Sequence, residues 1–258
     1  MRRWIVAALV AFSACRPSGA PQNPNFAAAS ESRDAIKVYE QLEALIDAQK
    51  DTKADREDAY ALISGWDDGS VAYAFARAAI AGRLAENRGL QAGGLVTEAE
   101  EFARRAREKE PDFREGSATR LLGTLYVLAP ARLLKHGDSE TGLALLEEEV
   151  KAHPERLISR LRLAEAYIAL GDPDPSREHL CAVKQGEASL SAGDKRLLAK
   201  LSEEVGGEGE LGCAAPGPPM PGVPLPGWAR PGGPLPGCPP PGTGTPSPGE
   251  PLPGWPGA

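Results

Sequence analysis

The feature that most constrains the fold is a spacing that occurs twice in the middle of the chain. In two segments a glycine precedes a proline by seventeen residues, at Gly94 and Pro111 and again at Gly137 and Pro154. Between each pair, small and apolar residues recur at the i, i+3, i+4 and i+7 spacing of a one-sided helix. Each proline then ends its helix, because proline lacks an amide hydrogen and restricts the residue before it. These segments are therefore predicted to be repeated helical units.

A different helix is predicted after each proline, and these two following helices share a short motif. It consists of leucine, a small residue, two further residues and a tyrosine: LGTLY from Leu122 to Tyr126 and LAEAY from Leu163 to Tyr167. The small residue lets a paired helix approach closely, and the tyrosine one turn later fills the space beside it. We predict that both tyrosines are buried in this way. Gly171 is predicted to end the second of these helices, as glycine does at the C′ position.

The combined pattern resembles the tetratricopeptide repeat (TPR), a helix pair of about 34 residues. The resemblance covers about residues 71–184. It implies an all-α fold of antiparallel helix-pair repeats, a TPR-like αα superhelix over residues 31–205, with a last helix in SAGDKRLLAKLSEEVG as its cap. The chain departs from the pattern by the inserts ENRGLQAGGLV and VLAPARLLKH, and by Glu149 where alanine is usual, which puts the packing of that helix in doubt. A generic helical bundle is the alternative.

The second insert supports a narrower resemblance. The stretch GTLYVLAPARLLKHGDSETGLALLEEEV is similar to the variant repeats of the T component of TRAP transporters. In those repeats a helix ends in Ala-Pro, a short linker follows, and Gly-Asp opens the next helix. Members of that family are repeat-built exported lipoproteins, thought to associate with solute-binding proteins. The resemblance implies such a protein as partner.

The start of the chain has the layout of a secretory signal peptide, predicted over residues 1–14. Arg2 and Arg3 form a short positive region, and an apolar run of eleven residues follows over 4–14. A helix needs about 20 apolar residues to span a bilayer, so this run is too short for a transmembrane helix.

The stretch FSAC resembles the lipobox of bacterial lipoproteins, with Phe12 where leucine is usual. This resemblance implies cleavage before Cys15, lipidation of Cys15 and a linker over residues 15–30. Arg16 follows the cysteine, and a residue other than aspartate there implies sorting to the outer membrane, facing the periplasm. An ordinary signal peptide that leaves an unmodified cysteine is the alternative.

Residues 206–258 form a tail of low sequence complexity, in which proline and glycine dominate. Seventeen of the 25 prolines lie after residue 215. A segment of this composition cannot build an apolar core, so disorder with polyproline II character is predicted. Trp228 and Trp255 could anchor the tail in an aromatic groove of a partner. The alternative is an extension with no partner.

Cysteine pairing is left open by the sequence. Lipidation of Cys15 would leave Cys181, Cys213 and Cys238 in an oxidising compartment. Cys213 and Cys238 both lie in the tail and could pair, but spacing does not fix connectivity.

Charge and motif content argue against two classes of function. The net charge is −7 without a compensating basic cluster, which disfavours nucleic acid as a partner because phosphate contacts need a basic face. The three histidines lie in separate segments, and the sequence contains neither a glycine-rich phosphate loop nor a Gly-x-Ser-x-Gly elbow. We therefore expect no enzyme activity, no metal site and no cofactor.

These observations lead to an expected function in the bacterial cell envelope. The protein is expected to be a lipid-anchored scaffold that binds another protein or peptide along the concave face of its superhelix. Repeat geometry assigns that face to the first helix of each pair, with Arg120, Thr124, Arg162 and Glu165 as candidate contacts. An accessory of a TRAP-type solute transporter, similar to the T component, and a purely structural lipoprotein are the alternatives. An open groove would favour protein binding, and a central pore or enclosed cavity would favour solute transport.

Overall fold

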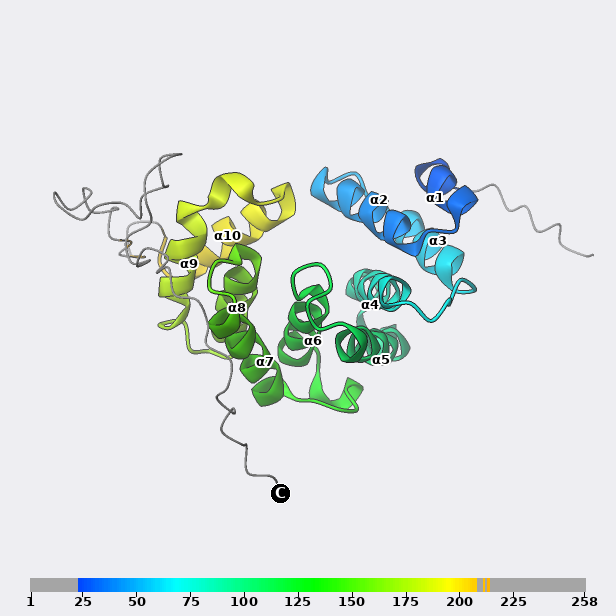
Figure 1. Cartoon of the computed structure of the whole chain (residues 1–258). Helices are drawn as coiled ribbons and strands as arrows, with labels where there is room; N and C mark the ends of the chain where they lie inside the picture. Colours follow the sequence, from blue (N-terminus) through cyan, green and yellow to red (C-terminus); the bar gives the residue numbers. More distant parts are fainter. Residues whose placement is uncertain (1–22, 208–210, 212, 214–258) are drawn as a thin grey trace, which may run out of the picture. The chain divides into compact units, whose positions relative to one another are not determined.

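The computed structural model describes residues 23–207, Leu211 and Cys213, and these residues form ten α-helices and no β-strand (Figure 1). The helices pack as antiparallel pairs, which confirms the predicted all-α fold class. None of the described helices is long and apolar enough to cross a membrane. The predicted signal peptide, Cys15 and residues 214–258 lie outside the described residues, so those predictions stay open.

Three helix pairs make up the middle of the structure, and four further helices flank them. At the N-terminal side lie α1 (Ala27–Ser32), α2 (Ala35–Asp47) and α3 (Lys53–Ile63). The pairs are α4 (Val71–Glu86) with α5 (Gly93–Lys109), α6 (Ser117–Leu128) with α7 (Ser139–Ala152), and α8 (Leu157–Ala169) with α9 (Ser176–Gln185). The last helix is α10 (Ala192–Glu204).

The predicted close approach of paired helices occurs between α6 and α7. A Cβ atom at Gly123 would lie 2.7 Å from Cγ of Leu146, and one at Gly142 would lie 2.7 Å from the carbonyl oxygen of Gly123. Tyr126 is buried beside them, and its ring occupies the place that a side chain at Gly137 would need. The prediction for Tyr126 is confirmed.

Tyr167 does not repeat this arrangement, so the prediction that both tyrosines are buried alike is wrong. Its side chain is half-buried, and its hydroxyl donates a hydrogen bond of 2.6 Å to Glu147 at the surface. The ring stacks on His179 with the two centroids 6.1 Å apart. Tyr126 is covered by Gly137, at the end of the insert between α6 and α7, and the connection from α8 to α9 has no comparable insert.

Gly171 ends α8 as predicted. Its φ angle is 82°, in the left-handed region that glycine tolerates. The amides of Gly171 and Asp172 donate to the carbonyls of Ile168 and Tyr167, each at 3.0 Å, which is the hydrogen-bond pattern of a Schellman motif.

The two inserts fold into short 3-10 turns, Gly89–Gln91 and Ala131–Leu133. The second insert is held by Glu100 on α5, a fully buried carboxylate. Glu100 accepts hydrogen bonds from the amides of Lys135 and His136 at 2.8 and 2.7 Å. A buried carboxylate that accepts two amide hydrogens is well compensated, so this insert is an integral part of the domain.

The packed domain continues beyond the predicted boundary at residue 205. Cys213 forms a disulfide with Cys181 on α9, and not with Cys238 as one reading of the sequence allowed. Leu211 is buried in the same cluster as Leu198 and Leu201 of α10. Leu211 and Cys213, both in the predicted tail, are therefore attached to the part of the domain formed by α9 and α10.

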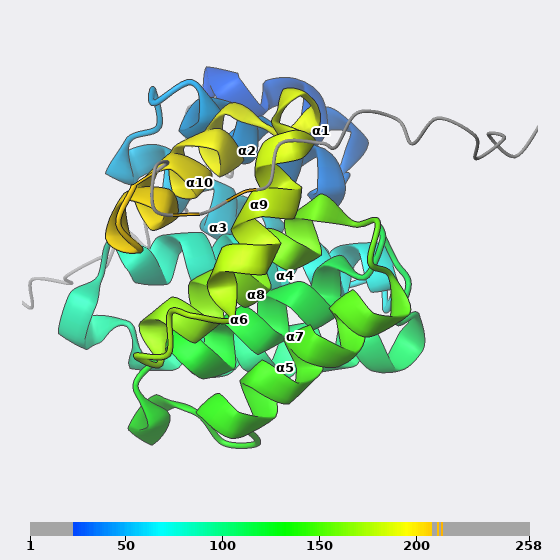
Figure 2. The same cartoon turned by 90° about the vertical axis from the view of Figure 1, so that its left-hand side faces the viewer.

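Five helices form a closed circuit on the inner side of the domain. Helices α2, α4, α6, α8 and α10 each contact the next, and α10 contacts α2 again. Figure 1 shows α5, α7 and α9 lying outside this circuit, and in Figure 2, which views the circuit from its side, α9 faces the viewer. The superhelix thus curves far enough for its first and last inner helices to meet, a contact that no local sequence pattern predicts.

Candidate functional site

The structure places the four predicted contact residues on neighbouring inner helices. Arg120 and Thr124 lie on α6, Arg162 and Glu165 lie on α8, and these two helices contact each other. Arg162 is already neutralised, because it binds Glu165 at 2.9 Å and Asp194 at 3.4 Å. The Oγ1 atom of Thr124 is buried and has no hydrogen-bond partner among the described residues.

Arg120 is the least compensated charge of this group. Its side chain is 11% exposed, and the nearest carboxylate oxygen, on Glu149, lies 3.8 Å away. Glu149 binds Arg156 more closely, at 3.0 Å. Burial lowers the pKa of the Arg120 guanidinium, and the positive charge of Arg156 lowers it further, against the opposing effect of Glu149. Arg156 also contacts the exposed carboxylate of Asp112 at 3.5 Å. The buried carboxylate of Glu149 is therefore shared unequally, and Arg120 is the more distant of its two arginines.

Glu149 has a clear structural role, which resolves the doubt about its packing. The alanine expected at this repeat position is replaced by a carboxylate that is 8% exposed. It accepts hydrogen bonds from Arg156 at 3.0 Å and from the hydroxyl of Ser159 at 3.2 Å. A buried carboxylate with these partners is the counter-ion of the site rather than a packing defect.

The loop before α6 is shaped around this carboxylate. Arg114, Glu115 and Gly116 follow one another with φ angles of 46°, 58° and 76°, all in the left-handed region. A Cβ at Gly116 would lie 2.6 Å from Oε1 of Glu149, so a side chain there would displace this carboxylate. The carbonyls of Arg114 and Glu115 accept hydrogen bonds from Arg120. The left-handed conformation is unfavourable for Arg114 and Glu115, which are not glycine. The hydrogen bonds from Arg120 to their carbonyls help to hold the backbone in it.

The same loop reaches across to α2. Arg114 donates to Glu40 at 2.8 Å, and its guanidinium carbon lies 5.9 Å from the ring centre of Tyr39. Burial, and next the carboxylate of Glu43, raise the pKa of the Tyr39 hydroxyl to about 12. Three arginines from different elements oppose this rise: Arg83, Arg114 and Arg120. The charged side chains of α2, α4 and α6 therefore converge on the inner side of the circuit.

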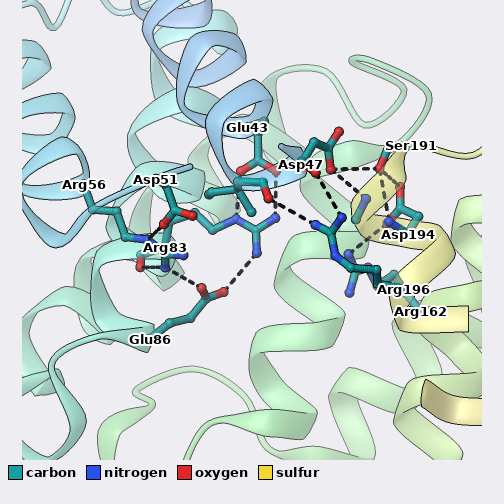
Figure 3. A network of polar contacts seen from close by, with 12 residues as sticks. Glu43, Asp47, Asp51, Arg56, Arg83, Glu86, Arg162, Ser191, Asp194 and Arg196 are labelled. Atoms are coloured by element: carbon teal, nitrogen blue, oxygen red, sulfur yellow. Dashed lines mark hydrogen bonds and ion pairs between the residues drawn. The ribbon is translucent and has the colours of Figure 1, made fainter. Parts of the chain in front are cut away.

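A network of ion pairs continues along α2, α3 and α4 (Figure 3). Arg83 binds both carboxylate oxygens of Glu43 at 2.7 Å and one oxygen of Glu86 at 3.0 Å. The largely buried Arg56 donates to Asp51 at 2.8 Å and to Glu86 at 2.7 Å. Bidentate arginine–carboxylate pairs are geometrically specific, so this network fixes the relative positions of the three helices.

The network in Figure 3 extends to the contact between α2 and α10. Oδ1 of Asp47 accepts hydrogen bonds from the amide of Gly193 at 2.8 Å and from the hydroxyl of Ser191 at 3.2 Å. Arg196 donates to the carbonyl oxygens of Asp47 and Ile46 at 3.0 and 3.1 Å. We call these contacts of Ile46, Asp47, Ser191, Gly193 and Arg196 the seam.

A surface hollow of about 340 Å³ lies beside the first insert, where α3, α4 and α5 meet. Its lining combines charged and apolar side chains: Glu57, Tyr60, Leu84, Arg88, Gln91 and Leu95. In the sequence, only the insert ENRGLQAGGLV indicates that this region departs from the repeat pattern. None of the four predicted contact residues lines this hollow.

The chemistry available to the inner face is recognition of charge and hydrogen-bonding groups. Among the described residues, no group of three or more histidine, cysteine, aspartate or glutamate side chains has the arrangement of a metal site. Sequence reasoning missed Arg114, Asp47 and Arg196. No local pattern distinguishes these residues, because their partners lie 74 to 150 positions away.

Comparison of the sequence with known family models and with curated proteins finds no match. The resemblances to the tetratricopeptide repeat and to the T component therefore depend on the motifs of this chain.

Proposed function

We propose that this protein is an exported, lipid-anchored, TPR-like scaffold that binds an acidic segment of another envelope protein or peptide at its inner helices. The observation that carries the proposal is the sharing of Glu149 by Arg120 and Arg156. Stacked helix-pair repeats commonly present such concave surfaces to partners.

The charge balance around Arg120 indicates the chemistry of the partner. Arg120 makes its hydrogen bonds to neutral oxygens, on Glu115, Arg114 and Ser159. A guanidinium prefers a carboxylate, with which it forms charge-assisted and often bidentate hydrogen bonds. A carboxylate from a partner would give Arg120 a closer counter-ion than Glu149, which lies 3.8 Å away and binds Arg156 at 3.0 Å.

The disulfide supports export of the chain. Disulfides such as Cys181–Cys213 persist in oxidising compartments and are rare in the cytosol. With the signal-peptide and lipobox patterns, this favours anchoring through lipid on Cys15, in the outer membrane and facing the periplasm. Replacing Cys15 with Ser should move the protein from the membrane fraction to the soluble fraction. Unchanged fractionation of that variant would contradict the anchor.

A second function, as a T component-like accessory of a TRAP-type transporter, is favoured by the closed circuit of inner helices. Contact between α10 and α2 joins the two ends of the circuit, whereas an open groove is expected for protein binding. A small carboxylate solute could then be the ligand, with a solute-binding protein as partner.

Binding measurements with the purified mature protein separate these functions. The probes are a fluorescent glutamate-rich peptide, a glutamine peptide of equal length, and a small dicarboxylate. We expect the glutamate peptide to bind, and Arg120→Gln to weaken its affinity about tenfold or more, because a charge-assisted hydrogen bond is lost.

The exposed Arg132 supplies the matched control, since Arg132→Gln removes the same charge outside the inner face. Equal losses in the Arg120 and Arg132 variants would contradict an inner site. Binding of the dicarboxylate but not the peptide would replace the scaffold function by the transport function. Absence of binding to all three probes would overturn the proposal of an acidic ligand.

A further inference from the structure

The seam differs from the other contacts of the inner circuit because it is polar. The buried apolar residues of α2 pack with those of α3 and α4, including Val38, Leu42 and Ile63. Those of α10 pack with α8 and α9 in a separate cluster that includes Leu198 and Leu201. What joins α2 to α10 is the set of hydrogen bonds of the seam.

The other inner contacts bury apolar side chains. Phe75 and Ala79 of α4 share a cluster with Ala118 of α6, and Leu161 of α8 shares a cluster with Leu198 of α10. Separation at those contacts would expose apolar surface to water, which is unfavourable. Separation at the seam would mainly exchange exposed hydrogen bonds for hydrogen bonds with water, so it is the least costly place to open the circuit.

The geometry of the seam is nevertheless specific. Asp47 is the last residue of α2, and its carboxylate accepts from an amide in the first turn of α10. Arg196 of α10 donates in return to the last carbonyls of α2. A carboxylate at a helix N-terminus and a cation at a C-terminus are each favoured by the helix dipole. A Cβ at Gly193 would lie 2.5 Å from Oδ1 of Asp47, so the approach depends on glycine.

We propose that the seam is a reversible latch, which opens so that an acidic peptide segment can reach the inner face around Arg120. This inference rests on the proposed function, because it takes the inner helices to be the binding face. A continuous chain cannot enter a closed circuit from the side, and a closed state that binds only after opening lowers the association rate.

The first test loosens the latch. In the full-length protein, Asp47→Ala with Arg196→Gln removes the side chains that join the two helices. Lys200→Gln, an exposed charge farther along α10, is the matched control. We expect the loosened variant to bind the glutamate peptide about threefold faster or more, as the competent fraction rises. The control should bind at the wild-type rate.

The second test locks the latch. The side-chain oxygens of Asp47 and Ser191 are 3.2 Å apart, so Asp47→Cys with Ser191→Cys places two thiols at the seam. Cys238→Ser removes the tail cysteine in this background. The oxidised, locked protein should bind the peptide at least about tenfold more slowly than the wild type. An unchanged rate in both the loosened and the locked protein would overturn the latch.

A distance measurement keeps the latch testable even if the proposed function fails. Spin labels on α2 and α10 report their separation without a ligand. The loosened variant should add a longer distance to the distribution. A single distance that is the same in the wild type and the loosened variant would overturn the latch whether or not the peptide binds. Absence of peptide binding with a variable distance would instead contradict only the proposed function.

Discussion

Glu149 departs from the repeat pattern, and it is also the residue on which the candidate site depends. Its carboxylate replaces a methyl group on α7; it binds Arg156 at 3.0 Å and lies 3.8 Å from Arg120, which stays poorly compensated. A departure from a repeat motif can therefore indicate a functional position, even where the motif itself only indicates packing.

Removing that carboxylate should be costly. Glu149→Ala leaves Arg120 without its nearest carboxylate and Arg156 with the more distant Asp112, and we expect the free energy of unfolding to fall by about 3–5 kcal/mol. Urea denaturation at pH 7 measures the change. The exposed Glu148 is the control, since Glu148→Ala removes the neighbouring charge and should cost about 0.5 kcal/mol or less. Similar losses for both variants would contradict the role given to Glu149.

At the scale of helices and turns, much of the structure could be predicted because its signals are local. The prolines, the small residue at 123 and the glycine at 171 act through neighbours along the chain or in the paired helix. The burial of Tyr167 was wrongly predicted, because burial of this tyrosine depends on a segment outside the motif. Gly137 covers Tyr126, whereas LAEAY repeats the motif without such a covering segment. The seam could not be predicted, since it depends on the summed curvature of all the helix pairs.

The N-terminus of α3 provides a pH-dependent test at this scale. Asp55 forms a capping box with Thr52 and also accepts hydrogen bonds from Asn23 and Asn25 at 2.8 and 2.9 Å. Burial raises the pKa of Asp55, but these hydrogen bonds outweigh burial and lower the pKa from 3.8 to about 2. The folded state therefore takes up this proton at lower pH than the unfolded state.

The sign of the pH effect follows from that difference. Asp55 stabilises the fold fully above about pH 4, and this stabilisation is lost as the pH falls toward 2. It amounts to about 2 kcal/mol. We expect wild type and Asp55→Asn to differ by this amount in unfolding free energy at pH 6 and to converge near pH 2. A constant difference across this range would contradict the assignment.

At the scale of the whole molecule, the position at which the packed domain ends determines how much of the tail can be removed without loss of stability. Truncation after Cys213 should leave the free energy of unfolding within about 0.5 kcal/mol of the full chain. Truncation after Gly206 removes Leu211 and the disulfide, which closes a separation of 32 residues. We expect that truncation to cost about 3–5 kcal/mol. Equal stability of the two truncated proteins in thermal denaturation would contradict the extended domain.

The central claim is that the inner helices bind the partner, and hydrogen–deuterium exchange of the full-length protein with the glutamate-rich peptide tests it most directly. We predict slower exchange in residues 114–128 and in α8, and unchanged exchange in the outer helices α5 and α9. Arg120→Gln should abolish the effect at the same peptide concentration. Protection confined to α5, α7 or α9, or equal protection in the variant, would contradict the account.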